Sequence, residues 1–206
     1  MNFDPKQHWE RIYQEKGPNQ VSWFKASLDI SLELISLSGI DKNKKIIDVG
    51  GGASVFVDKL IEKKFTDLTV LDISANAIQY AKERLKEKAN KVKWVESDIA
   101  QFQPPELYDL WHDWAVFHFF IDPADRKKYI KVLDKAVKPN GFVIIASFAL
   151  EGPLKCSGLN VERYDAEKLS KELGTHFTLI KNVGQTHLTP WHSEQKFSYC
   201  LFKKQA

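Results

Sequence analysis

Short apolar runs alternate with helix-forming stretches through most of the chain. The apolar runs have the length of single buried strands and fall at 46–49, 67–71, 91–96, 107–113 and 142–148. The helix-forming stretches between them fall at 54–63, 75–88 and 122–138. Strands that alternate with helices predict a parallel sheet with right-handed crossovers and helices on both faces.

The two ends of the chain depart from this alternation. At the amino end, Asp4-Pro5 predicts the start of a helix that runs to about residue 16, and a second amphipathic helix follows near residues 28–35. At the carboxyl end, a helix at 165–173 precedes strands at 177–182 and 196–202, with no helix between those two strands. The last two strands must therefore pair as a hairpin. The predicted fold class is α/β, a Rossmann-like doubly wound and mostly parallel seven-stranded sheet with an antiparallel C-terminal hairpin.

Composition and charge narrow the class of protein. The 206 residues are 43% hydrophobic and 28% charged, which is ordinary for a globular domain. A net charge of +3 without a Lys/Arg block gives no reason to expect a nucleic-acid partner. Two cysteines exclude a disulfide framework, and no apolar run has the roughly twenty residues that cross a bilayer. We therefore expect a cytoplasmic, monomeric protein without a membrane partner.

The stretch Lys45–Ser54, KIIDVGGGAS, is the most informative in the chain. A strand leads directly into Gly50, Gly51 and Gly52 and then into a helix, which allows a ligand to lie against bare backbone. Asp72 ends the next strand, about twenty residues later, where a carboxylate can accept two hydrogen bonds from a ribose diol. Together these features predict a nucleoside-binding site.

The spacing of the glycines indicates which kind of nucleoside. A dinucleotide site requires G-x-G-x-x-G, and Val55 occupies the third glycine position. Read from the acid, Asp48-x-Gly50-x-Gly52-x-Ser54 resembles motif I of the class I, seven-strand S-adenosylmethionine-dependent methyltransferases, with serine in place of the last glycine. Serine is a good helix N-cap, so the substitution is mild.

Further signals in the chain match the same family. Asp72 matches its ribose-binding acid, Asp98-Ile99 its adenine-contacting pair, and residues 137–142 its turn before the fifth strand. The aromatic residues near the amino end are similar to those of a subgroup that includes protein-lysine methyltransferases, where they close over the cofactor. The resemblance implies S-adenosyl-L-methionine as cofactor, held by Trp9, Tyr13, Trp23, Asp48, Gly50, Gly51, Gly52, Asp72, Ile73, Asp98, Ile99 and His112.

Residues 111–119, WHDWAVFHF, carry the catalytic candidates. They resemble the W-H-D-R-A-V-F-H-F motif of bacterial small methyltransferases of unassigned substrate, with Trp114 in place of the arginine. Because parallel strands end on the ligand side of the sheet, we expect His112 and Asp113 to border the methyl group. Asp113 would orient an amine or hydroxyl, and His112 or His118 would accept its proton.

Several of these residues also have a purely structural interpretation. His112 can pack on the cofactor without exchanging protons, and His118, among phenylalanines, can be a core residue. Trp9, Tyr13 and Trp23 can seal the edge of the domain instead of contacting a sulfonium. In the functional interpretation, residues 1–39 form a helical lid and residues 40–206 the methyltransferase domain.

The loops after the fifth strand and between the last two strands are expected to shape substrate choice. His187, His192 and Cys156 lie in them, but their spacing supports no metal site. The favoured function is methyl transfer from S-adenosylmethionine to a small-molecule or protein nucleophile. The alternatives are a nicotinamide-dependent oxidoreductase, which would share Asp72, and a relative that binds the nucleoside without turnover.

Overall fold

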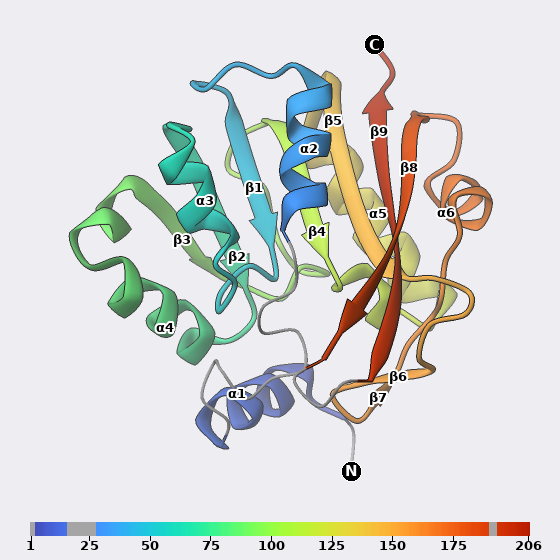
Figure 1. Cartoon of the computed structure of the whole chain (residues 1–206), viewed down its shortest axis with the longest axis horizontal. Helices are drawn as coiled ribbons and strands as arrows, with labels where there is room; N and C mark the ends of the chain where they lie inside the picture. Colours follow the sequence, from blue (N-terminus) through green and yellow to red (C-terminus); the bar gives the residue numbers. More distant parts are fainter. Residues whose placement is uncertain (1–2, 16–27, 190–192) are drawn as a thin grey trace.

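The computed structural model of the chain describes residues 3–15, 28–189 and 193–206. Its centre is a seven-stranded sheet of order β3-β2-β1-β4-β5-β9-β8 (Figure 1). The strands are β1 Lys45–Val49, β2 Asp67–Asp72, β3 Val92–Glu96, β4 Tyr108–Trp114, β5 Val137–Phe148, β8 Phe177–Leu188 and β9 Glu194–Lys204. Strands β1 to β5 pair in parallel, and β9 is antiparallel to both β5 and β8. The predicted fold class, including its antiparallel hairpin, is confirmed.

Helices cover both faces of this sheet (Figure 1). They are α1 Pro5–Glu15, α2 Asp29–Ser38, α3 Phe56–Glu62, α4 Ala75–Leu85, α5 Pro123–Ala136 and α6 Ala166–Leu173, with 3₁₀ turns at Lys86–Lys91 and Phe117–Phe119. Side chains of α2 and α3 fill the core on one face, and those of α5 and α6 fill the core on the other. We call the edge where β1 to β5 end the carboxyl edge. Helix α1 lies across it, below the ends of β1 and β4 in Figure 1.

Helix and strand boundaries differ from the predicted ones where a local residue overrides the hydrophobic pattern. The helix expected at 122–138 ends at Ala136, and Val137 already pairs with Tyr108 of β4. Lys138 precedes a proline, which disfavours helical backbone, so the chain is extended before the turn. The helix expected at 75–88 ends at Leu85, because Lys86 takes a φ of 52° and the next turn is 3₁₀.

The last two strands are much longer than predicted. They run over Phe177–Leu188 and Glu194–Lys204, so His187 lies on β8 and not in a loop. The loop after β5 also contains a small antiparallel pair, β6 Lys155–Cys156 and β7 Leu159–Asn160. In Figure 1 the far end of the long hairpin, this small pair and α1 all lie toward the lower end of the molecule. The carboxyl edge is therefore bordered by three elements distant in sequence.

Candidate active site

The glycine bend follows β1 at the carboxyl edge. Gly50 has a φ of +69°, a conformation that L side chains rarely adopt. Its backbone N–H donates to the carbonyl of Leu71 at 2.7 Å, so the bend stays attached to β2. A Cβ added at Gly50 would lie 2.2 Å from Val116, in the turn after β4. The bend is thus held between the end of β2 and the turn after β4, the two strands that flank β1.

Asp72 lies directly behind the bend. Its carboxylate accepts hydrogen bonds from the backbone N–H groups of Gly52 and Ser74, both at 2.9 Å. A Cβ at Gly52 would lie 2.7 Å from the same carboxylate, so no larger residue fits there. Burial raises the pKa of Asp72 from 3.8 to about 6, although the two N–H groups oppose the shift. The carboxylate is therefore held in a fixed orientation, beside backbone that a ligand can approach.

Asp48 and His112 form a buried pair beneath the bend. His112 Nδ1 lies 2.7 Å from Asp48 Oδ1, and His112 Nε2 lies 2.9 Å from the hydroxyl of Ser31 on α2. Because a carboxylate only accepts hydrogen bonds, Nδ1 donates to Asp48, and Nε2 shares a hydrogen bond with the Ser31 hydroxyl. The imidazole also stacks on Phe56 of α3, with ring centroids 4.0 Å apart. Both nitrogens of His112 are therefore engaged inside the protein, and the ring orients Asp48.

Asp113 points to the opposite face of the sheet. Its carboxylate accepts from the backbone N–H groups of Val116 at 2.9 Å and Phe117 at 3.0 Å, and from the hydroxyl of Tyr129 on α5. Burial raises the pKa of Asp113 to about 6 against these hydrogen bonds. The expectation that His112 and Asp113 both border the methyl group stays a prediction; their side chains have partners on opposite faces of the sheet, because neighbouring residues of a strand face opposite ways. The described contacts make Asp113 the anchor of the turn after β4.

His118 follows that turn and is fully buried. Its ring lies against Phe119, at 4.4 Å between centroids, and against Phe148 at the end of β5, at 4.9 Å. Neither ring nitrogen has a hydrogen-bond partner among the described residues. Burial lowers the pKa of His118 to about 3, so the imidazole is neutral. A buried neutral imidazole with two unpartnered nitrogens can still donate one hydrogen bond and accept another.

The predicted adenine contacts lie one strand further along the same edge. The Ser97 N–H donates to the carbonyl of Asp72 at 2.9 Å, which ties the end of β3 to the end of β2. Asp98 is half-buried and accepts from the backbone N–H of Ala100 at 2.8 Å, while Ile99 is buried in the core. Ile73 is half-buried between Asp72 and the start of α4. Asp72 and Ile73 thus lie at the end of β2, and Asp98 and Ile99 follow the end of the adjacent strand β3.

Helix α1 brings two of the predicted aromatic residues to the carboxyl edge. Trp9 meets Phe119 edge-on, with centroids 5.2 Å apart. Tyr13 is buried, and its carbonyl accepts from the hydroxyl of Tyr80 on α4 at 2.9 Å. Trp23, the third predicted aromatic contact, lies outside the described residues. Trp9 and Tyr13 thus contact Phe119 and Tyr80, and their role as a lid over the cofactor stays a prediction.

Trp114, which stands where the related motif has arginine, contacts the C-terminal hairpin of β8 and β9. Its indole N–H donates to the hydroxyl of Tyr199 at 3.0 Å, and that hydroxyl donates to Gln185 at 2.9 Å. Its ring stacks on Phe197 of β9, at 5.4 Å and 21°. The indole thus supplies packing and one neutral hydrogen bond at this position.

Glu10 and Ser31 belong to this edge, and sequence reasoning missed them both. Ser31 binds His112, and Glu10 of α1 binds the start of α4. Ser31 carried no local signal, because a serine in an amphipathic helix is ordinary. Glu10 follows the tryptophan of the amino-terminal aromatic motif, but nothing in the sequence indicates a partner 64 to 66 residues away.

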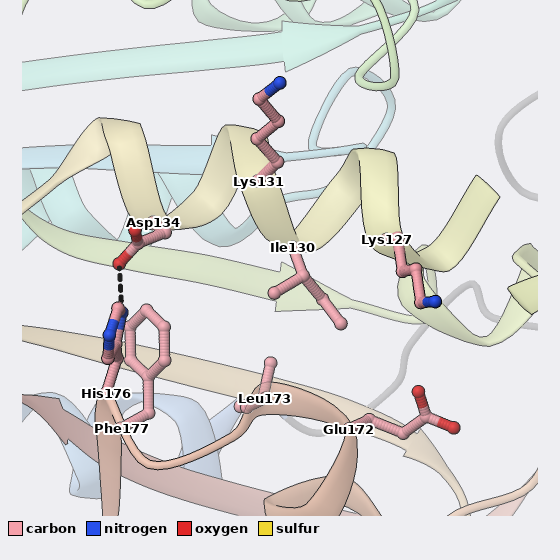
Figure 2. Close-up of a pocket in the computed structure, with 8 residues that line it drawn as sticks. All are labelled: Lys127, Ile130, Lys131, Asp134, Glu172, Leu173, His176 and Phe177. Atoms are coloured by element: carbon pink, nitrogen blue, oxygen red, sulfur yellow. Dashed lines mark hydrogen bonds and ion pairs between the residues drawn. The ribbon is translucent and has the colours of Figure 1, made fainter. Parts of the chain in front are cut away.

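A surface hollow of about 250 Å³ lies elsewhere, between α5 and the turn from α6 to β8 (Figure 2). His176 and Asp134 face each other there at 3.4 Å, with Lys127 and Lys131 along the rim. Strand β8 runs parallel to β5, so its start lies at the opposite edge of the sheet from the bend. The hollow is therefore remote from the predicted chemistry.

Two features are absent from the described part of the chain: a cluster of metal ligands and a membrane-spanning helix. Over 3–15, 28–189 and 193–206, no three His, Cys, Asp or Glu side chains gather as metal ligands would. Within the same part of the chain, none of the helices has the length and apolar character needed to span a bilayer. Cys156 is buried, and burial raises its thiol pKa to about 11.

Comparison with known sequences places the chain among methyltransferases. Residues 40–197 match the family described as "Methyltransferase domain". "EEF1A lysine methyltransferase 2" of Danio rerio is 26% identical over 159 residues, which is 69% of this chain and 67% of that protein. "Nodulation protein S" of Rhizobium tropici is 31% identical over 101 residues, 49% of this chain and 42% of that protein. The chain thus spans about two thirds of the first of these relatives and under half of the second.

Solved structures share the fold along nearly the whole chain. The N-methyltransferase NodS from Bradyrhizobium japonicum, in complex with S-adenosyl-L-homocysteine, superposes with a TM-score of 0.75 and 19% identity over 98% of this chain and 100% of that one. The 1,6-didemethyltoxoflavin-N1-methyltransferase of Burkholderia thailandensis has a TM-score of 0.77 and 15% identity over 98% of this chain and 87% of that one. At these identities the likeness concerns the fold.

Proposed function

This chain belongs to the methyltransferase family, and we propose that it moves the methyl group of S-adenosylmethionine to a nitrogen atom of a small molecule or protein side chain. That it is an S-adenosylmethionine-dependent methyltransferase of the class I fold follows from the family match and from the fold shared with solved methyltransferases. The choice of nitrogen rests on the relatives, among which are a lysine methyltransferase and an N-methyltransferase. No feature of the chain favours the oxidoreductase alternative, since Val55 occupies the third glycine position of a dinucleotide site.

One observation carries the position of the cofactor: the Gly52 N–H is bound to the buried Asp72 carboxylate at 2.9 Å. It brings bare backbone and a carboxylate together at the carboxyl edge, which suits the ribose and tail of a nucleoside. Asp48 Oδ2 fits the same interpretation, because it is buried without a partner among the described residues. Asp72 would accept the ribose hydroxyls, with Asp98 and Ile99 toward the adenine and Gly50, Gly51 and Gly52 against the tail.

Bound S-adenosylmethionine supplies an electrophilic methyl group on a positively charged sulfur. The residues of this chain must then hold an uncharged nucleophile in line with that methyl group and exclude water. The carboxylates of Asp48 and Asp72 place negative charge near the bend, which favours a cationic cofactor. Tyr13, Trp9 and Phe119 form an apolar boundary on the α1 side.

We assign the acceptor contact to His118. Its two ring nitrogens have no partner among the described residues, so they can hydrogen-bond an acceptor. The dehydration that keeps His118 neutral also favours the neutral form of an amine, which is the form that attacks a methyl group. Asp113 acts through Val116, Phe117 and Tyr129, so we place it as a positioning residue for the turn that carries His118.

Isothermal titration calorimetry tests the cofactor assignment. The wild type should bind S-adenosylhomocysteine and not NAD, and Asp72→Ala should lose at least tenfold in affinity because a ribose diol loses its acceptor. Transfer of tritium from [methyl-³H]S-adenosylmethionine to nitrogen in a cell-extract fraction would then exclude a binding-only protein. Equal affinity of the wild type and Asp72→Ala would overturn the site, and label found only on oxygen or sulfur would overturn the choice of nitrogen.

A further inference from the structure

Glu10 makes the densest set of polar contacts between α1 and the rest of the protein that the described residues show. Its carboxylate accepts from the Ser74 hydroxyl at 2.9 Å, the Ala75 N–H at 2.7 Å, the Asn76 N–H at 3.2 Å and the Asn76 amide at 2.6 Å. These donors form the first turn of α4, where N–H groups lack partners within the helix. A carboxylate at this end of a helix is stabilised by the helix dipole.

The donors around Glu10 favour its ionised form. Burial opposes ionisation, but the hydrogen bonds from Ala75, Ser74 and Asn76 outweigh it, so the pKa of Glu10 lies below its ordinary value. The side chain is therefore ionised at neutral pH. Arg11, the next residue, is exposed and shares none of these contacts.

Ser74 connects Glu10 to the carboxylate that we assign to the ribose. Its hydroxyl donates to Glu10 and accepts from the Ala77 N–H at 3.1 Å, while its own backbone N–H donates to Asp72 at 2.9 Å. Asp72 in turn holds the Gly52 N–H. A continuous series of hydrogen bonds thus runs from α1 through the start of α4 to the glycine bend.

We propose that Glu10 is a positioning residue for cofactor binding, which docks α1 on the first turn of α4 and couples that docking, through Ser74, to Asp72. The inference rests on the proposed cofactor site. Coupling of this kind is reciprocal: cofactor binding at Asp72 favours docked α1, and docked α1 favours cofactor binding. Docking also brings Trp9 onto Phe119, next to His118. The docking of α1 through Glu10 therefore covers the region around His118, where we place the methyl acceptor, when the cofactor is bound at Asp72.

A purely structural role for Glu10 makes a different prediction. If Glu10 only caps α4, its loss should lower the melting temperature without changing how α1 responds to a ligand. Lys6 provides a matched control, because it also joins α1 to the carboxyl edge, through an exposed ion pair with Glu96 at the end of β3. Exposed ion pairs of this kind contribute little.

Hydrogen exchange and calorimetry on the full chain separate the two roles. In Glu10→Gln, S-adenosylhomocysteine should bind about tenfold more weakly, and its addition should no longer protect the amides of residues 5–15. Lys6→Ala should behave as the wild type in both measurements. Asn76→Ala, which removes one partner and leaves Glu10 and Asp72 in place, should show an intermediate loss of affinity. Wild-type affinity and protection in Glu10→Gln would overturn the proposal.

Hydrogen exchange measured without ligand tests the docking role of Glu10 separately from the cofactor assignment. Glu10→Gln should exchange faster over residues 5–15 than both the wild type and Lys6→Ala, with or without any cofactor. If the wild type bound no S-adenosylhomocysteine but this difference appeared, the cofactor site would be wrong and the docking role of Glu10 would stand. If the difference were absent, the docking role would be wrong whatever the protein binds.

Discussion

Cofactor affinity should depend on pH through one buried carboxyl group. Asp72 is fully buried behind the glycine bend, and its pKa is raised to about 6 before any ligand arrives. A ribose diol donates hydrogen bonds, so it requires the ionised carboxylate as acceptor. A protonated Asp72 would present its own O–H to the diol and lose an acceptor position. Lowering the pH through 6 should therefore weaken binding.

The size of the effect follows from the fraction of Asp72 that is ionised. With a pKa of about 6, roughly 90% of the group is ionised at pH 7 and roughly 10% at pH 5. Affinity should therefore fall about tenfold between these two values if the ionised form alone binds. The interval lies below the titration of the cofactor's own amine, for which an α-amino group ionises at about 8.

Calorimetric titration with S-adenosylhomocysteine between pH 5 and pH 7 measures this slope. The matched control is Asp72→Asn, which is neutral at every pH and should bind more weakly but with a flat profile. Asp113 also has a pKa of about 6, but it is present in both proteins, so the comparison removes its contribution. Equal wild-type affinity at both ends of the range, or the same slope in Asp72→Asn, would refute the reasoning.

The same pKa has an opposite consequence for the stability of the ligand-free protein. Because the folded-state pKa of about 6 lies above the ordinary 3.8, the native state binds this proton more tightly than the unfolded state does. The associated stability is fully present below pH 4 and is lost as the pH rises to about 6, a change of about 3 kcal/mol. Urea unfolding at pH 4.5 and pH 7 should show about 2 kcal/mol of this loss in the wild type relative to Asp72→Asn, because part of the change has already occurred by pH 4.5. The ionised Asp72 carboxylate, which we assign to the ribose, thus lowers the free energy of unfolding of the ligand-free protein.

Three further substitutions test other parts of the site. Gly52→Ala should abolish S-adenosylhomocysteine binding in calorimetry and lower the free energy of unfolding by about 1–3 kcal/mol. The reason is that the added Cβ would lie 2.7 Å from Ala77, and normal affinity would contradict it. Asp113→Ala should cost about 2–4 kcal/mol in urea unfolding, since Tyr129 and two backbone N–H groups lose their acceptor, and an unchanged midpoint would contradict the anchoring role. His118→Phe should leave stability equal or higher, because two unpartnered buried nitrogens disappear, yet lower tritium transfer at least tenfold. Full transfer by that variant would move the acceptor contact elsewhere.

The amino-acid sequence alone predicted the succession of strands and helices and the meeting of the glycine bend with a carboxylate. Both follow from short-range information: the alternation of apolar runs, the three glycines after Val49, and a carboxylate at the end of the following strand. Parallel strands joined by right-handed crossovers bring consecutive strand ends together, so adjacent motifs in the sequence become adjacent in space. Gly52 and Asp72 therefore meet as predicted, at 2.9 Å.

Only the tertiary structure decided which side chains face each other across the carboxyl edge. His112 and Asp113 are neighbours in a promising motif, yet one supports Asp48 and the other anchors the turn after β4, because a pleated strand alternates its faces. The sequence gives no sign that Glu10 has a special role; its contacts form only because α1 packs against the start of α4, which lies far along the chain. Contacts of this kind depend on how complete elements pack together, and no local pattern of residues specifies that packing.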